Sequence, residues 1–152
     1  MTQSLCCKVL KALSGKTLVT AESLTGGGIG NALTAISGSS AVYKGGVISY
    51  TNEVKESVLG VPAEILETYG AVSAQTAAAM ASGVRKLLQA DVAVSVTGLA
   101  GPGGDDFGNP VGTVFIGYED AHKACVKSCF FTGNREEIRQ QTIQTALAMI
   151  LE

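Results

Sequence analysis

A serine that directly precedes a run of glycines is the first residue in this sequence that could do chemistry. Ser23 stands in the segment Glu-Ser-Leu-Thr-Gly-Gly-Gly, at the end of an apolar stretch typical of a strand. The bare backbone N–H groups of such a turn, at the start of a helix, suit an oxyanion or a phosphate. The alternative is structural, because a serine in this position also caps a helix. From this segment alone, both interpretations stay open.

A nucleophilic serine needs a base, and a lysine is the better candidate here. The one histidine, His122, falls in a predicted turn, where we expect a solvated residue rather than a member of a Ser-His-Asp triad. Lys55 follows Asn52, which can cap a short helix, so the positive end of the helix dipole should disfavour its ammonium form. The alternative is an ordinary exposed lysine. Tyr50, in the same loop, is either a further polar group of the site or a strand-end aromatic with its hydroxyl in water.

Two arginines near the start of the last predicted helix indicate an anion. Arg135 and Arg139 lie four residues apart on one face, and cations in a first helical turn oppose the helix dipole. Pairing with Glu136 or a neighbouring carboxylate explains either arginine alone at least as well. Asp105 and Asp106 have no companion at metal-binding spacing and are interpreted as a polar loop. The four cysteines show no C-x-x-C spacing, so we predict neither a metal site nor disulfides.

Hydrophobic periodicity predicts alternating helices and strands. Strands are expected over 16–21, 46–50, 92–96, 112–118 and 123–131, and helices over 3–13, 25–36, 52–59, 62–68, 73–88 and onward from a cap at Asn134. This order predicts an α/β fold in one domain, residues 1–152: a three-layer α/β/α sandwich with a mostly parallel five-stranded mixed sheet and one antiparallel strand. Ligands of such sheets bind outside the carboxyl ends of the strands. The segments 21–30, 50–55 and 97–104 are therefore expected to meet.

Composition excludes several classes of protein. Hydrophobic residues make up 46% and charged residues 16% of the chain, so it is not disordered. A net charge of -2 without any basic run argues against nucleic-acid binding. No apolar stretch is long enough to span a membrane, so we expect a cytoplasmic protein that binds no membrane. The low charged fraction also favours a homo-oligomer, in which part of the surface is covered.

Several spaced motifs together resemble the C-terminal domain of the CinA family, which includes stand-alone nicotinamide-nucleotide amidohydrolases. The resemblance covers nearly the whole chain and runs, in order, through Ala21–Gly27, Gly38–Ser40, Gly45–Lys55, Gly70–Ser73, Val96–Gly104, Pro110–Val114, and Gly133–Arg135 with Ile138 and Arg139. It implies a small-molecule nucleotide substrate: nicotinamide mononucleotide, deamidated to nicotinate mononucleotide and ammonia in pyridine-nucleotide salvage. No metal or other cofactor is implied.

The resemblance also implies roles for individual residues. Ser23 would be the nucleophile, Lys55 its base and Tyr50 a helper, while backbone groups near Gly26 and Gly27 would hold the oxyanion. By their placement, the residues expected to bind substrate are Thr25, Gly26, Gly27, Asn52, Thr97, Gly98, Gly101, Gly103, Gly104, Arg135 and Arg139, the two arginines meeting the phosphate. One departure is Leu24, where the family usually carries cysteine. The competing hypothesis is a non-catalytic nucleotide-binding or protein-interaction module that keeps the same pocket.

Overall fold

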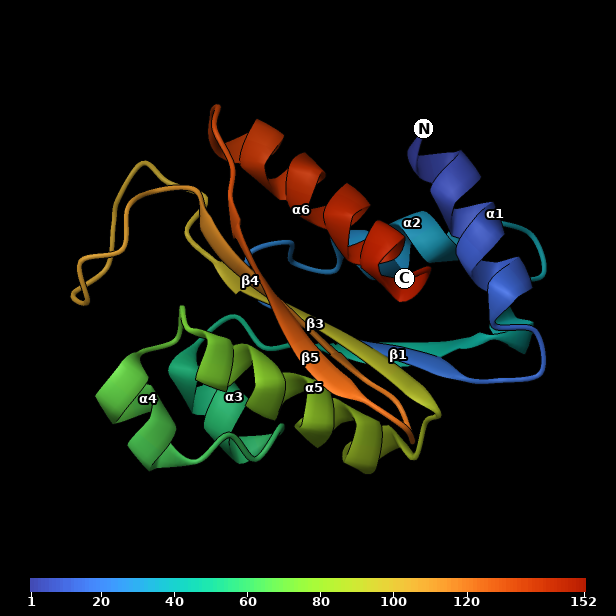
Figure 1. Ribbon diagram of the computed structural model, residues 1–152, viewed down its shortest axis with the longest axis horizontal. Helices are drawn as coiled ribbons and strands as arrows, with labels where there is room; N and C mark the ends of the chain where they lie inside the picture. Colours follow the sequence, from blue (N-terminus) through green and yellow to red (C-terminus); the bar gives the residue numbers. More distant parts are fainter.

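A twisted sheet between two layers of helices forms the protein, as the computed structural model of residues 1–152 shows (Figure 1). The sheet has five strands in the order β2-β1-β3-β4-β5. Their bounds are β1 Leu18–Glu22, β2 Tyr43–Ile48, β3 Val92–Gly98, β4 Thr113–Glu119 and β5 Ala124–Phe130. The predicted three-layer α/β/α arrangement is confirmed.

Strand directions follow from the connections. β1 pairs in parallel with both β2 and β3, each of which is reached through helical segments. β4 pairs antiparallel with β3, and β5 antiparallel with β4 across a tight hairpin. Consequently β4 alone runs against the other four strands, which confirms the prediction of a mostly parallel sheet with one antiparallel strand.

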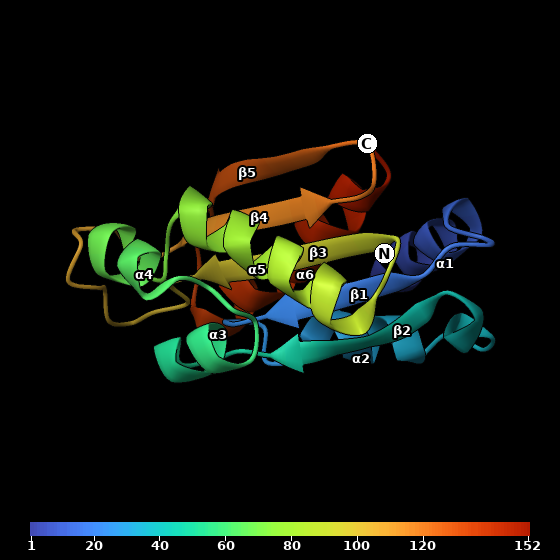
Figure 2. The ribbon, with the colours of Figure 1, turned by 90° about the horizontal axis from the view of Figure 1, so that it is seen from below.

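The helices divide between the two faces of the sheet. On one face lie α1 (Thr2–Ala12), α2 (Gly28–Thr34) and α6 (Arg135–Ile150), and on the other lie α3 (Asn52–Ser57), α4 (Ala63–Tyr69) and α5 (Ala74–Leu88), as Figures 1 and 2 show. A short 3-10 helix covers Ser39–Ala41. The predicted caps at Ser73 and Asn134 are present, the second as a full capping box.

Each face of the sheet has its own hydrophobic core, because side chains alternate along a strand. On β3, Val94 belongs to the cluster under α1, α2 and α6, while its neighbour Ala93 belongs to the cluster under α5. β3 is buried from Val92 to Thr97, and its nearly continuous apolar sequence predicted such a buried central strand. The carboxyl ends of β1 and β3 are thereby fixed side by side.

Two predicted elements differ in the structure. The strand expected to be buried over 46–50 is instead Tyr43–Ile48 at the edge of the sheet, where alternate residues are exposed. Its two glycines carry no side chains, so the alternation left no pattern in the sequence. The helix expected from Thr25 begins only at Gly28, because the backbone at Gly26 and Gly27 has positive φ angles of 59° and 98°.

Candidate active site

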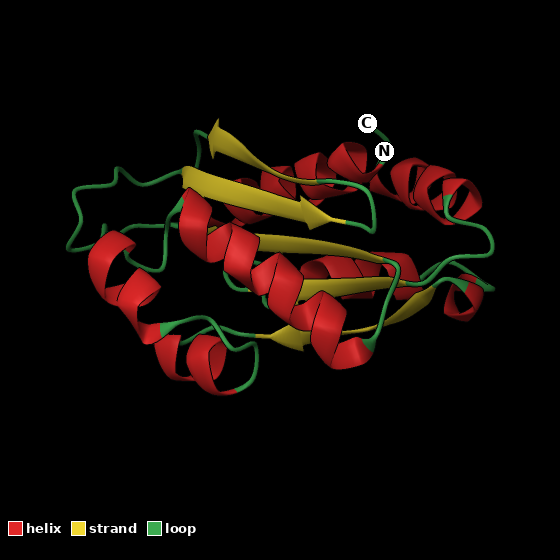
Figure 3. Ribbon diagram, turned by 60° about the horizontal axis from the view of Figure 1, so that its bottom comes forward, coloured by secondary structure: helices red, strands yellow, loops and turns green.

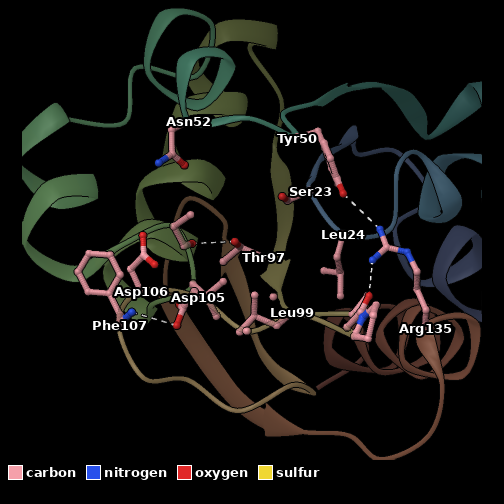
Figure 4. Close-up of a pocket in the computed structure, with 18 of the residues that line it drawn as sticks. Ser23, Leu24, Tyr50, Asn52, Thr97, Leu99, Asp105, Asp106, Phe107 and Arg135 are labelled. Carbon is pink, nitrogen blue, oxygen red and sulfur yellow. Dashed lines mark hydrogen bonds between the residues drawn. The ribbon is translucent and has the colours of Figure 1, made fainter.

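The three segments expected to meet do so at one end of the sheet. Ser23 follows β1, Tyr50 and Asn52 follow β2, and Thr97 is the second-last residue of β3. They line a cavity of about 650 Å³ that is completed by the loop between β3 and β4 (Figure 4). Figure 3 shows this loop, residues 99–112, extending past the sheet beside α4. The volume of the cavity falls within the range of small-molecule binding sites.

Ser23 and Lys55 are in contact at this cavity. The Nζ atom of Lys55 lies 3.0 Å from Oγ of Ser23. The same nitrogen donates hydrogen bonds to the backbone carbonyl of Ser49 at 2.7 Å and to that of Tyr50 at 3.2 Å. Lys55 is 1% exposed and Ser23 is 6% exposed, although both line the cavity. Lys55 is the one buried residue of the short helix α3, so this helix directs the lysine side chain into the protein.

Burial lowers the pKa of Lys55 to about 8. No carboxylate pairs with the side chain, as Lys55 takes part in none of the three ion pairs in the structure. The sequence predicted a lowered pKa from the helix dipole, but the cause in the structure is desolvation. The helix cap is also Thr51 rather than Asn52, since the Thr51 hydroxyl accepts the N–H of Val54.

The three contacts of Lys55 fit both protonation states: an ammonium group donates to all three acceptors, and a neutral amine donates to two of them. A neutral amine has two N–H groups and one lone pair. Two backbone carbonyls accept the two N–H groups, which leaves the lone pair for the third contact, the hydroxyl of Ser23. In this form Ser23 donates and Lys55 accepts, as a serine nucleophile and its base require.

Glu22 is a buried residue beside Ser23 that the sequence analysis did not single out. Its carboxylate is 2% exposed and accepts hydrogen bonds from the Thr25 hydroxyl at 2.6 Å and from the backbone N–H groups of Ile29 at 2.9 Å and Gly30 at 3.0 Å. These bonds fix the turn that directly follows Ser23. The signal was available, because an acid just before a glycine-rich helix start is placed to accept unpaired helical N–H groups.

Most of the residues expected to bind substrate lie on the cavity wall. With Tyr50, these are Asn52, Thr97, Gly98, Gly101, Gly103, Gly104 and Arg135. The guanidinium group of Arg135 donates to the carbonyl of Gly101 at 2.6 Å and to the hydroxyl of Tyr50 at 3.2 Å, joining two loops across the cavity (Figure 4). Tyr50 is 59% exposed and its hydroxyl contacts Arg135, not Ser23.

Thr25, Gly26 and Gly27 do not line the cavity. The hydroxyl of Thr25 is used by Glu22, and the N–H of Gly26 donates to the carbonyl of Ser23 at 3.1 Å. The turn therefore uses these groups to hold its own shape. The N–H groups of Leu24, Thr25 and Gly27 have no acceptor within the protein, and of these three residues only Leu24 lines the cavity.

Arg139 also lies away from the cavity. Its guanidinium group donates to the carbonyl of Leu24 at 2.9 Å and to that of Thr25 at 3.2 Å, and pairs with Glu136 at 3.0 Å. The two arginines thus differ: Arg135 faces the cavity, whereas Arg139 supports the Ser23 turn from behind. Sequence spacing placed both on one helix face but gave no information on this difference.

Other candidate groups lie outside the cavity. His122 is exposed in the β4–β5 turn, and all four cysteines are free thiols. No group of three or more His, Cys, Asp or Glu residues is arranged to hold a metal ion. None of the helices combines the length and the apolar composition that crossing a membrane requires.

Cavity residues that the sequence did not single out for binding include Ala71, Val72 and Phe107.

Comparisons with known proteins agree with this architecture. The model of the CinA C-terminal domain matches residues 2–152. A CinA-like protein of Geobacter sulfurreducens is 48% identical over 133 residues, and one of Parasynechococcus marenigrum is 48% identical over 136 residues; each match covers 88% of this chain and 32% of the relative. The chain thus spans about a third of the length of the curated relatives it matches.

Solved structures share the whole fold. The crystal structure of the competence damage-inducible protein A from Klebsiella pneumoniae superposes with a TM-score of 0.96 at 38% identity, covering 98% of this chain and 94% of that one. The competence/damage inducible protein of Agrobacterium tumefaciens superposes with a TM-score of 0.95 at 42% identity, covering 99% and 93%. The chain belongs to the CinA C-terminal domain family.

Proposed function

We propose that the protein hydrolyses the amide of nicotinamide mononucleotide to nicotinate mononucleotide and ammonia. The observation that carries this proposal is the 3.0 Å contact between the Nζ atom of Lys55 and the Oγ atom of Ser23, inside a cavity of nucleotide-binding size. A buried lysine with a pKa near 8 is available as a base near neutral pH. The substrate is inferred from the resemblance of the sequence motifs to nicotinamide-nucleotide amidohydrolases.

The first half of the reaction forms an acyl-enzyme. Neutral Lys55 takes the hydroxyl proton of Ser23, and Oγ attacks the carboxamide carbon to give a tetrahedral intermediate. The free N–H of Leu24, the residue after the nucleophile, is the backbone donor offered to the oxyanion. The Lys55 ammonium group then protonates the leaving nitrogen, the C–N bond breaks and ammonia departs.

The second half releases the acid. A water molecule gives a proton to Lys55 and attacks the ester carbon, and the C–Oγ bond breaks as the proton passes back to Ser23. The balance is one amide and one water consumed, one carboxylate and one ammonium ion produced. Arg135 supplies a positive charge at the cavity that no carboxylate neutralises, so it is placed to bind the phosphate. Tyr50 acts through Arg135 and through its backbone carbonyl.

Ammonia release from nicotinamide mononucleotide, in the presence of a chelator, tests the proposal. We expect wild-type activity that falls by about three powers of ten or more in Ser23→Ala and in Lys55→Arg, with the double variant no worse than either. Lys55→Arg is informative because arginine keeps the charge and donors but cannot act as a base. Glu53→Gln, an exposed change on the same helix, serves as the control. Binding without turnover in the wild type would instead favour a non-catalytic module.

A further inference from the structure

The loop between β3 and β4 forms a wall of the cavity that the reaction scheme leaves unused. It brings Asp105, Asp106 and Phe107 to the end of the cavity away from Arg135, with Ser23 between the two ends (Figure 4). The two ends of the cavity therefore differ in charge: the guanidinium group of Arg135 lies at one end, and carboxylates beside an aromatic ring lie at the other.

Asp105 holds this loop in place. Its carboxylate accepts the backbone N–H groups of Phe107 at 3.1 Å and Asn109 at 3.0 Å, and the side-chain amide of Asn109 at 2.8 Å. That amide also donates to the carbonyl of Val72 at 3.2 Å, which ties the loop to the segment before α5. The neighbouring positions 106 and 107 are thereby fixed in space, while both oxygens of the Asp105 carboxylate accept hydrogen bonds from the loop.

Asp106 and Phe107 are free to meet a ligand. Asp106 is exposed and takes part in none of the ion pairs in the structure. Phe107 packs over Gly70, where a Cβ atom would lie 2.7 Å from Cδ1 of the phenyl ring, so only glycine leaves room for it. Phe107 is nevertheless 49% exposed, and it lines both this cavity and a neighbouring one beside α4. An aromatic ring that is packed firmly and is still half exposed can stack against a ring of a ligand.

Charge explains what kind of ring fits. Arg135 is positive and has no carboxylate partner, and Lys55 is largely protonated below its pKa of about 8. A nicotinamide ring substituted at its nitrogen is itself a cation, with the charge only a few bonds from the reacting carboxamide. Carboxylates on the wall offset the repulsion of such a ring by these two positive groups; Asp105 supplies one of them, although its oxygens accept N–H groups of the loop. Asp106 is the carboxylate on the wall that no protein group uses.

We propose that Asp106 and Phe107 are specificity-determining residues that select carboxamides on a positively charged aromatic ring. This inference rests on the proposed amidase function. The carboxylate of Asp106 compensates the ring charge, and the face of Phe107 attracts the cation through its π electrons. A neutral ring gains neither interaction, so free nicotinamide is discriminated against.

The test compares two compounds that differ in ring charge: 1-methylnicotinamide, a cation, and nicotinamide, which is neutral. Their Kd values are measured by NMR titration in the Ser23→Ala background, so that turnover does not disturb the equilibrium. We expect the cation to bind more tightly than the neutral compound. Asp106→Asn and Phe107→Leu should each reduce that preference by about two- to fivefold. Glu67→Gln, which makes the same change in net charge on the exposed face of α4, should leave the preference unchanged.

Each outcome decides the matter. An equal Kd for both compounds, binding of neither at millimolar concentration, or an undiminished preference in Asp106→Asn overturns the inference. Added salt should weaken the preference, because the carboxylate is exposed and its charge is screened. A clear preference for the cation together with no ammonia release by the wild type overturns only the proposed function.

Discussion

The pH dependence of turnover is the sharpest consequence of the buried lysine. In the proposed mechanism only the neutral amine of Lys55 can take the proton of Ser23, and burial lowers the pKa of this amine to about 8. About a tenth of the lysine is then neutral at pH 7 and about a hundredth at pH 6. We therefore expect kcat to fall about tenfold for each pH unit below 7 and to level off above about pH 9.

The assay is ammonia release at saturating nicotinamide mononucleotide across this pH range, with circular dichroism at each point to show that the protein stays folded. The substrate phosphate also titrates, near pH ~6. Nicotinamide riboside, which lacks the phosphate, is therefore the control and should show the same midpoint. A flat profile between pH 6 and 8, or a maximum on the acid side, would refute a neutral lysine as the base.

Three further predictions concern stability and assembly. The pKa of Lys55 is about 8 in the folded state and 10.5 ordinarily, so the folded state binds fewer protons than the unfolded state between these pH values. The free energy of unfolding of the wild type should therefore rise by about 3 kcal/mol relative to Lys55→Met as pH rises through that window. Urea unfolding of both proteins at pH 7 and 10.5 measures this, and a constant difference contradicts it. Glu22→Ala leaves three donors without their acceptor and should lower the free energy of unfolding by about 3 kcal/mol, whereas an unchanged urea midpoint would show that the carboxylate is dispensable. A homo-oligomer is expected from the low charged fraction and from large apolar side chains on the surface such as Phe130, 62% exposed; light scattering at 15.5 kDa would exclude it.

The sequence predicted the features that depend on the order of the elements and on residue type. Alternating helices and strands gave the layers, and the rule that ligands bind at the carboxyl ends of parallel strands brought Ser23 and Lys55 together. Sequence-based prediction failed for features that depend on the direction in which a side chain points. Arg135 and Arg139 share a helix face, yet one reaches the cavity and the other the backbone of the Ser23 turn. Two glycines likewise concealed that β2 is an edge strand.

Glu22 and Lys55 show why the site holds two buried ionisable groups that do not pair. Both are almost completely buried, and an ion pair between them would be the simplest way to satisfy each. Instead, N–H and O–H donors satisfy the carboxylate, and backbone carbonyls accept from the amine. A carboxylate beside Lys55 would favour the ammonium form and raise its pKa, which would remove the base at neutral pH. Dipoles without net charge hold the lysine in place while leaving its proton easy to lose, so the fold accepts a buried and unpaired amine because the proposed reaction requires one.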